Sequence, residues 1–400
     1  MPFIHRPRTI RTTVPAVCAV LALLTTSAAA APQRTDGTGH AEDWRGEPYS
    51  VTELAGVAGL PSAERDLLVT YGSTGAAGER VTASGTVAVP PGKPPDEGWP
   101  VVSWAHGTTG VSDLCAPSAQ FPDGPAHDYV SMADETLDQW IERGYAVVRA
   151  DFEGLGTPGG HPYLNGPSAA NTVADLVTAA QRVDENVGED WIALGHSQGA
   201  HGVLYTADGT RPGVRSSDRQ PLGVVSAAPG GVGVSELVAF FEEADPDDER
   251  TREALPFLPL LLLGAAAAEP GPAPEEYLTE GAQPVLSAAR TGCMDDIREA
   301  AQGISADAIF REDAQTDGLE AYFRSQEPDD LALAVPTLFV QGTEDVLVPP
   351  DETEWLAETL ADRATVDVDY RAYEGEDHRG VLTASFEDTV EFADRLRAER

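Results

Sequence analysis

A pentapeptide that places a serine between two glycines, residues 195–199 (Gly-His-Ser-Gln-Gly), constrains this chain more than any other feature. It follows directly on the apolar run 191–194 (Trp-Ile-Ala-Leu), which is typical of a buried strand. A strand that turns sharply into a helix at such a pentapeptide forms a nucleophile elbow, in which the glycines avoid collisions and the serine hydroxyl is exposed. The pattern therefore predicts that Ser197 is a nucleophile, followed by a helix of small residues.

An acid and a histidine follow Ser197 in the order that an elbow serine requires. Asp345 comes just after a strand-like run, and His378 stands in a loop after an alternating run. A base must remove the serine proton as the hydroxyl attacks, and a carboxylate must orient that base. We therefore expect a triad of Ser197, His378 and Asp345, with Glu344 as the alternative acid.

Two backbone donors are expected to stabilise a developing oxyanion. One is the Gln198 amide. The other belongs to the loop after the strand-like residues 101–105, where residues 106–110 read His-Gly-Thr-Thr-Gly. Within that loop we expect the donor to be Thr108 or Thr109. The histidines near these motifs are expected to be structural: His106, His161, His196 and His201.

Strand and helix signals alternate along most of the chain. Strands are predicted near residues 84–89, 100–105, 145–151, 190–195, 222–228, 335–341 and 366–373. Helices are predicted between several of them, over residues 133–143, 168–186 and 383–397. This alternation predicts the α/β class, with a mostly parallel sheet covered by helices on both faces.

The strand pattern stops after a Pro-Gly-Gly segment and resumes only about a hundred residues later. We predict that residues 231–330 form a helical cap or lid insertion, and that 48–230 and 331–400 form the core. The apolar run 255–268 is too short and too interrupted by proline to cross a bilayer, so no stable membrane span is expected. This run packs as the core of the cap, or binds an acyl chain, or does both.

Three further segments give the chain a resemblance to a known family. They are 144–156 (Gly-Tyr-Ala-Val-Val-Arg-Ala-Asp-Phe-Glu-Gly-Leu-Gly), 161–164 (His-Pro-Tyr-Leu) and 115–118 (Cys-Ala-Pro-Ser). Together with the elbow and the triad, they resemble the secretory lipases of the lipase A type, and the chain looks like a bacterial member over roughly residues 45–398.

The resemblance implies the α/β-hydrolase fold and a secreted carboxylic-ester hydrolase that needs no cofactor, with a helical cap over its site. Fungal members of that family commonly carry Tyr-Ser-Gly in the elbow and a different oxyanion loop. This chain instead has His-Ser-Gln at 196–198 and His-Gly-Thr at 106–108. The triad pattern is intact, but the preferred acyl length does not follow from the resemblance.

The amino-terminal residues have the features of a secretory signal. Three arginines precede an apolar stretch at 14–24, and small residues follow it. We expect residues 1–31 to be a signal peptide and 32–47 to be a flexible lead-in, so that the mature protein is secreted and extracellular. Retention as an uncleaved anchor is the alternative.

Cleavage of the signal peptide would remove Cys18 and leave two cysteines, Cys115 and Cys293. A pair of cysteines in an oxidising compartment favours one disulfide between them. Two unpaired buried thiols are the alternative. The bridge would join the loop after the oxyanion strand to the predicted cap.

Acidic residues dominate the charge of the chain. It carries 66 Asp and Glu against 26 Lys and Arg, a net charge of −40, and loss of the three signal arginines would make it −43. This charge excludes nucleic-acid binding by phosphate neutralisation. It favours solubility, either as an adaptation to salt or as a general trait of an acidic secreted proteome. No metal or cofactor is expected, because the sequence has no His-x-x-x-His or Cys-x-x-Cys spacing.

The sequence thus predicts a monomeric carboxylic-ester hydrolase, a lipase or esterase, that acts on ester or lipid substrates through an acyl-enzyme on Ser197. A serine peptidase and an acyltransferase of the same fold are the alternatives, because both share this nucleophile chemistry. A domain that only binds its partner is not favoured, since all three triad positions are filled in order.

Overall fold

The structure is a computed structural model that describes residues 44–54, 59–210, 220–243, 245 and 248–400. The expected signal peptide, Cys18 and most of the expected lead-in lie outside the described residues. Residues at the end of that lead-in contact the sheet. The Gly46 N–H donates to the Gly72 carbonyl at 2.8 Å, and the Arg80 guanidinium lies 5.2 Å from the centre of the Trp44 ring.

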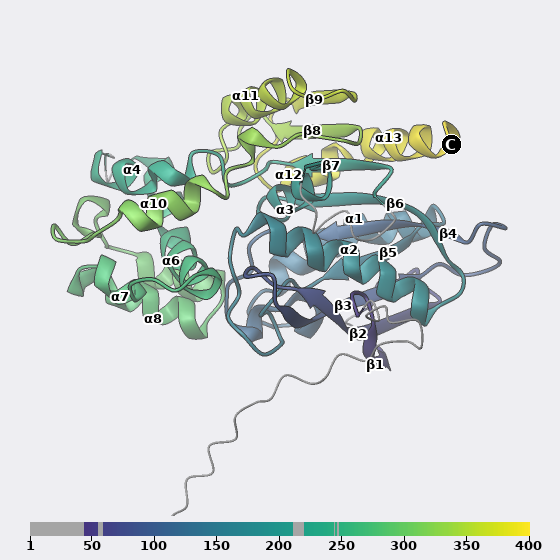
Figure 1. Cartoon of the computed structure of the whole chain (residues 1–400), viewed down its shortest axis with the longest axis horizontal. Coiled ribbons are helices and arrows are strands. Elements are labelled where there is room, and N and C mark those ends of the chain that lie inside the picture. The colour runs from purple at the N-terminus through teal and green to yellow at the C-terminus, as the bar shows by residue number, and fades with distance from the viewer. Residues whose placement is uncertain (1–43, 55–58, 211–219, 244, 246–247) are drawn as a thin grey trace, which may run out of the picture. The chain divides into compact units, whose positions relative to one another are not determined.

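A nine-stranded sheet runs through the described chain in the order β1-β2-β3-β5-β4-β6-β7-β8-β9 (Figure 1). Its strands are β1 (Pro48–Glu53), β2 (Arg65–Thr74), β3 (Arg80–Val89), β4 (Trp99–Ala105), β5 (Ala146–Ala150), β6 (Val187–His196), β7 (Gly223–Ala227), β8 (Thr337–Gly342) and β9 (Val368–Tyr373). In this order, each neighbouring pair from β5 through β4 to β9 is parallel. The three pairs β1–β2, β2–β3 and β3–β5 are antiparallel. The predicted α/β class with a mostly parallel sheet is confirmed.

All seven predicted strands are present as β3 to β9, but the sequence reasoning missed β1 and β2. Five of the six residues of β1 are exposed, so this edge strand has no alternation of apolar and polar residues to reveal it. The ten residues of β2 bury both apolar and polar side chains, including Ser73, which also hides the alternation.

Six helices flank the sheet: α1 (His127–Glu142), α2 (Gly166–Val183), α3 (Gln198–Thr206), α11 (Pro350–Ala361), α12 (Gly380–Ala384) and α13 (Phe386–Ala398). Helices α2, α3 and α11 pack on one face, and α1, α12 and α13 pack on the other. Helix α2 begins after Asn165, whose side chain accepts the Ser168 N–H. It ends at Val183 rather than at 186, because Asp184 has an extended backbone. The final predicted helix is divided at Ser385.

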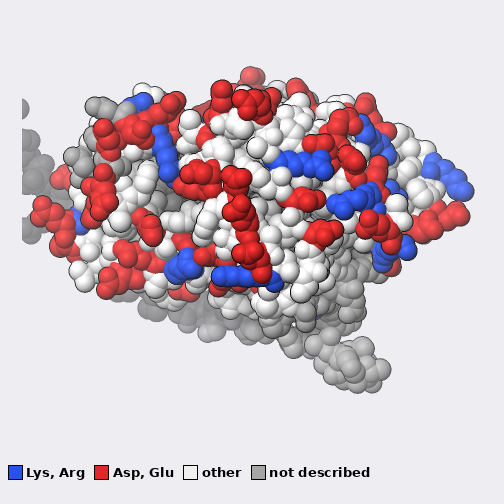
Figure 2. Space-filling view, turned by 90° about the horizontal axis from the view of Figure 1, so that it is seen from above, with Lys and Arg blue, Asp and Glu red and all other residues white. Residues whose placement is uncertain are grey.

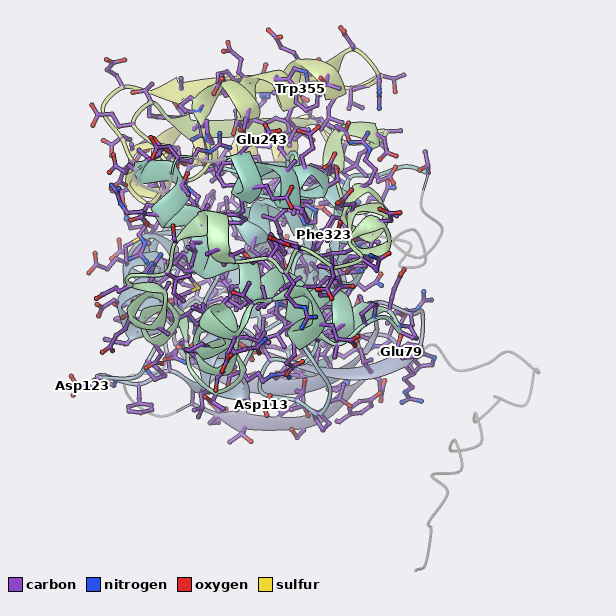
Figure 3. All side chains as sticks on the ribbon, turned by 90° about the vertical axis from the view of Figure 1, so that its left-hand side faces the viewer. Glu79, Asp113, Asp123, Glu243, Phe323 and Trp355 are labelled. Carbon is purple, nitrogen blue, oxygen red and sulfur yellow. A yellow bond between two sulfur atoms is a disulfide. The ribbon has the colours of Figure 1, made fainter. Side chains whose placement is uncertain are left out.

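The described elements between β7 and β8 are all helical, and we call residues 231–330 the insertion. Its α-helices are α4 (Leu237–Glu243), α5 (Glu249–Ala254), α6 (Leu258–Ala268), α7 (Pro274–Tyr277), α8 (Gln283–Thr291), α9 (Met294–Ala301) and α10 (Asp317–Arg324). They gather at one end of the sheet (Figure 1). They pack around their own apolar core, in which Phe323 is buried (Figure 3). Tyr163 and Leu164 join this core from the segment before α2.

The stretch Glu249–Ala268, which contains α5 and α6, is long and apolar enough to be a candidate membrane span by length and composition. Of its most apolar window, 56% is buried inside the protein. Leu260 and Leu262 are at most 1% exposed, because they pack in the core of the insertion. The apolar run predicted from the sequence therefore contributes to that core.

Cys115 and Cys293 form a disulfide between residues 178 positions apart, as predicted. The bridge ties the loop after β4 to the start of α9. Two backbone contacts accompany it: the Met294 N–H donates to the Thr109 carbonyl at 3.2 Å, and Gly110 pairs with Cys293. The disulfide therefore fixes the insertion to the loop in which an oxyanion donor is expected.

Replacing Cys115 and Cys293 together with alanine should lower the free energy of unfolding by roughly 2 to 4 kcal/mol, because the bridge restricts the unfolded chain. Urea unfolding of the oxidised protein and the double variant measures the difference. Reduced wild-type protein should unfold like the variant. Identical midpoints for the oxidised and reduced wild type would show that the bridge contributes nothing.

Candidate active site

The elbow at Ser197 has the geometry that the two glycines were predicted to permit. Ser197 has φ 55° and ψ −115°, a strained backbone for a residue with a side chain. A Cβ on Gly199 would collide with the Ala105 backbone, and one on Gly195 would collide with Gly199 itself. The chain can therefore leave β6 and enter α3 within a single residue.

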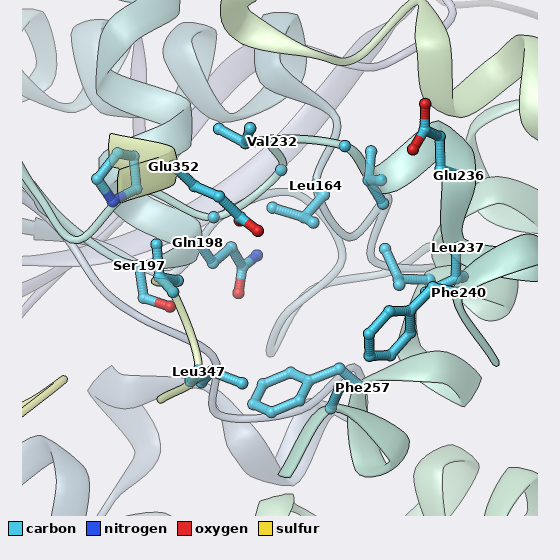
Figure 4. A pocket seen from close by; sticks show the side chains of 18 of the residues that line it. Leu164, Ser197, Gln198, Val232, Glu236, Leu237, Phe240, Phe257, Leu347 and Glu352 are labelled. Carbon is cyan, nitrogen blue, oxygen red and sulfur yellow. The ribbon is translucent and has the colours of Figure 1, made fainter. Parts of the chain in front are cut away.

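Backbone hydrogen bonds hold the strained residue in place. The Ser197 N–H donates to the Ala227 carbonyl at 2.9 Å, and its carbonyl accepts the N–H groups of His201 and Gly230. Only 8% of Ser197 is exposed. The residue lies on the wall of a pocket (Figure 4).

Asp345 lies after β8 and is bound by four donors. Its Oδ1 accepts the N–H groups of Leu347 and Val348, each at 2.9 Å. Its Oδ2 accepts from Gln341 Nε2 at 2.9 Å and from His378 Nδ1 at 2.7 Å. Burial alone would raise the pKa of Asp345, but these bonds and the charge of His378 outweigh it and lower the pKa. The Asp345 side chain is therefore a buried, ionised carboxylate.

The structure distinguishes the two candidate acids. Asp345 is 4% exposed and bonded to His378, whereas the neighbouring Glu344 is exposed. Gln341, which sequence reasoning missed, also donates a hydrogen bond to Asp345. Its carboxamide is itself fixed, since its oxygen accepts the Thr353 hydroxyl at 2.8 Å. The sequence did hold a signal for Gln341, because a polar glutamine is unusual within a run of buried apolar strand residues.

His378 contacts the elbow at His196, the residue that precedes Ser197. The His196 and His378 rings are 4.7 Å apart, and His196 Nε2 lies 2.7 Å from the His378 carbonyl oxygen. In the described part of the chain, no hydrogen bond joins the Ser197 hydroxyl to His378. Asp345 and His378 are therefore paired, and His378 contacts His196, the residue that precedes Ser197.

The expected oxyanion donors lie on two elements. Gln198 is the first residue of α3, so its N–H has no acceptor within the helix, and Gln198 lines the pocket. Thr108 is half-buried, and its hydroxyl shares a 2.7 Å hydrogen bond with the hydroxyl of Tyr163, a residue that lines the pocket. Thr109 is buried and uses its carbonyl to accept the Met294 N–H. Thr108 thus contacts a residue that lines the pocket, whereas Thr109 contacts the start of α9.

Each of the four histidines that were expected to be structural contacts another part of the fold. His106 stacks on Phe152 at 4.4 Å, and His201 Nε2 lies 2.7 Å from the Gln326 carbonyl oxygen. His161 accepts a hydrogen bond at 2.7 Å from the side chain of Gln198, a residue that lines the pocket. Burial lowers the pKa of His106 to about 4 and that of His161 and His196 to about 3.

The pocket has a volume of about 400 Å³. Its polar side includes Ser197 and Gln198, and its apolar wall comes largely from the insertion, with Leu237, Phe240 and Phe257 among the side chains (Figure 4). An ion pair that sequence reasoning missed, Arg250 with Glu352 at 2.5 Å, joins the insertion to the core on this wall: these residues lie on α5 and α11.

Solved structures show the same architecture over most of the chain. The structure of lipase A from Candida antarctica gives a TM-score of 0.67 at 16% sequence identity, covering 84% of this chain and 78% of that one. Its closed state gives a TM-score of 0.69 at 15% identity, covering 88% and 82%. The chain has the α/β-hydrolase fold. The rice cell wall degrading esterase LipA from Xanthomonas oryzae gives 0.65 at 17% identity, covering 89% and 98%.

Sequence comparison adds one family match to this α/β-hydrolase fold. The model of the prolyl oligopeptidase family matches residues 286–397, a segment that contains Asp345 and His378 but not Ser197. A search of curated proteins found no match. Among the residues that the structure describes, no group of three or more His, Cys, Asp or Glu side chains is arranged to hold a metal ion.

The lowered pKa of His161 makes a prediction about acid stability. The unfolded imidazole takes up a proton below about pH 6.5, whereas the folded one does so only near pH 3. Stability from this group is therefore lost as the pH falls, at about 1.4 kcal/mol per pH unit. Glutamine does not titrate, so in His161→Gln this loss is absent. The free energy of unfolding of the variant, relative to that of the wild type, should therefore increase as the pH falls from 6 to 4. Urea unfolding at each pH measures the difference, and parallel curves would contradict it.

Proposed function

We propose that this α/β-hydrolase is a secreted carboxylic-ester hydrolase, a lipase or esterase, in which Ser197, His378 and Asp345 form the catalytic triad. The observation that carries the proposal is the 2.7 Å hydrogen bond between buried Asp345 and His378, beside a strained serine on a pocket wall. The lipase and esterase structures that share the fold support the same reaction class.

In the first step, His378 Nε2 removes the Ser197 proton while Oγ attacks the ester carbonyl carbon. His378 Nδ1 donates to Asp345, which leaves Nε2 free to act as the base. Bonds of this kind between nucleophile and base are often long until substrate binds, so we propose that the substrate brings Ser197 Oγ and His378 Nε2 into contact.

The carbonyl oxygen becomes an oxyanion as the Ser197 ester bond forms. We propose that the N–H of Gln198 stabilises it from the start of α3, assisted by an N–H of the Thr108 loop. The tetrahedral intermediate then collapses, the imidazolium protonates the departing alcohol, and an acyl-enzyme is left. Water then attacks the acyl carbon while His378 takes a proton from it. The bond between this carbon and Ser197 Oγ breaks, the acid product leaves, and the imidazolium returns the proton to Ser197.

The pocket favours an apolar acyl group. The side chains of Leu237, Phe240 and Phe257 line it, and each methylene buried there contributes about 0.8 kcal/mol. Acidic side chains are spread over the face seen in Figure 2 and outnumber the basic ones there. Such a surface repels anionic substrates, so we propose neutral esters.

A serine peptidase is the second candidate, because the prolyl oligopeptidase family matches residues 286–397. Strong recognition of a free substrate amine would require a carboxylate in the pocket that is both unpaired and shielded from water. Glu352 is paired with Arg250, and Glu236, the other carboxylate on the wall, is exposed. These features favour the ester. An acyltransferase would use the same intermediate with an alcohol in place of water.

Secretion is part of the proposal. The disulfide between Cys115 and Cys293 supports an oxidising compartment, in line with the basic and apolar amino-terminal sequence.

Initial rates on p-nitrophenyl esters from acetyl to palmitoyl test the reaction class, with Ser197→Ala in parallel. We expect hydrolysis that depends on Ser197 and that rises from acetyl to longer chains, because the pocket wall is apolar. Turnover of aminoacyl p-nitroanilides with no ester hydrolysis would favour the peptidase instead.

The acid assignment has a matched control on the neighbouring residue. Asp345→Asn should lower kcat by roughly 10³ to 10⁴-fold, because the amide no longer fixes the His378 tautomer. Glu344→Gln should leave kcat within about threefold of wild type, because Glu344 is exposed and, among the described residues, His378 pairs with Asp345 instead. The reverse pattern would assign the role of the acid to Glu344. Circular dichroism of both variants checks that they fold.

A further inference from the structure

Tyr129 and His196, which we call the Tyr129–His196 pair, lie between the loop of the oxyanion donors and the loop of the base. Tyr129 belongs to α1, and its hydroxyl accepts the Gly107 N–H at 2.6 Å. The same hydroxyl lies 2.9 Å from His196 Nδ1. His196 Nε2 lies 2.7 Å from the His378 carbonyl oxygen. A chain of hydrogen bonds therefore connects Gly107 to His378.

The donor and acceptor of each of these hydrogen bonds follow from the two groups at the ends of the series, the His378 carbonyl and the Gly107 N–H. The His378 carbonyl can only accept, so His196 Nε2 carries the proton. A neutral imidazole has one N–H, and Nδ1 must therefore accept from the Tyr129 hydroxyl. That hydroxyl keeps a lone pair for the Gly107 N–H. Every donor in the chain has an acceptor, and only one arrangement of protons satisfies all of them.

Burial keeps His196 in the neutral form that this arrangement requires. Tyr129 is 7% exposed and His196 is 1% exposed. Burial is the main cause that lowers the pKa of His196 to about 3, and the charge of His378 lowers it further. His196 can thus stand beside His378 without adding a second positive charge when His378 is protonated during the reaction.

Ring packing holds the pair against the loop of the base. The Tyr129 and His196 rings stack at 5.8 Å, and the Arg379 guanidinium lies 5.4 Å from the centre of the Tyr129 ring. Arg379 and His378 are neighbours in the chain, so the pair contacts both the carbonyl of the base and the side chain that follows it. Hydrogen bonds and ring contacts converge on the same short segment.

We propose that the Tyr129–His196 pair is a positioning unit that sets the oxyanion loop and the His378 loop relative to Ser197. This inference rests on the function proposed for Ser197 and His378. Neither member is among the residues that line the pocket. A displacement of about 1 Å in catalytic geometry can cost on the order of 10²-fold in rate, which is the effect that the pair prevents.

Tyr129→Phe tests the proposal against a matched control, Tyr71→Phe. Both hydroxyls are buried, and the Tyr71 hydroxyl donates to the Thr172 carbonyl at 2.8 Å, between β2 and α2. Both variants should lose similar thermal stability. Only Tyr129→Phe should lower kcat on the best p-nitrophenyl ester, by about 10 to 100-fold with KM within about threefold, because binding residues are untouched.

A pair of substitutions at His196 isolates the bond to the base. His196→Gln keeps a side-chain N–H that can donate to the His378 carbonyl, whereas His196→Met has a similar length and no donor. We expect His196→Gln to retain at least fivefold more kcat than His196→Met. Equal kcat in two folded variants would contradict a role for this bond.

Hydrogen–deuterium exchange gives a measurement that needs no turnover. In Tyr129→Phe, peptides covering residues 106–110 and 375–380 should both exchange faster than in wild type, whereas Tyr71→Phe should leave them unchanged. Unchanged exchange in both peptides, or equal kcat in the two tyrosine variants, would overturn the proposal. Absence of Ser197-dependent turnover in the wild type would instead refute the proposed function, and the exchange result would still decide whether the pair positions the two loops.

Discussion

The close approach of the elbow to strand β4 is the contact on which the site depends. Gly199 lies so near the Ala105 backbone that a side chain there would collide with it. This contact lets the chain turn at Ser197 with a positive φ and start α3 with a free N–H at Gln198. Because β6 lies in parallel between β4 and β7, the loops that follow these three strands meet at the same end of the sheet.

Hydrogen bonds and burial together set the charges of the groups around His378. Hydrogen bonds and the charge of His378 keep Asp345 ionised, against the effect of its burial. Burial raises the pKa of the carboxyl groups of Asp151 and Glu153, while three buried histidines near the site have lowered pKa values: His106, His161 and His196. In the proposed mechanism, a positive charge on His378 would therefore be stabilised mainly by Asp345.

The features that were predicted correctly are those marked by residues close together in the sequence. Glycines mark the turn at Ser197, and runs of apolar residues mark the central strands, so the fold class and the pairing of Asp345 with His378 could be anticipated. Strand β1 could not, because nearly all of its residues are exposed. Tyr129 was also missed, since its role depends on contacts with Gly107 and His196 across the fold, which leave no periodic pattern in the sequence.

Covalent labelling tests the central claim, that Ser197 is the nucleophile activated by His378 and Asp345, most directly. The protein would be incubated with a p-nitrophenyl alkylphosphonate, which traps an activated serine, and the labelled peptide identified by mass spectrometry. The account predicts one phosphonate per chain, on Ser197, with release of one p-nitrophenolate and loss of ester hydrolysis. Stoichiometric labelling of another residue, or continued ester hydrolysis with Ser197 fully modified, would contradict it.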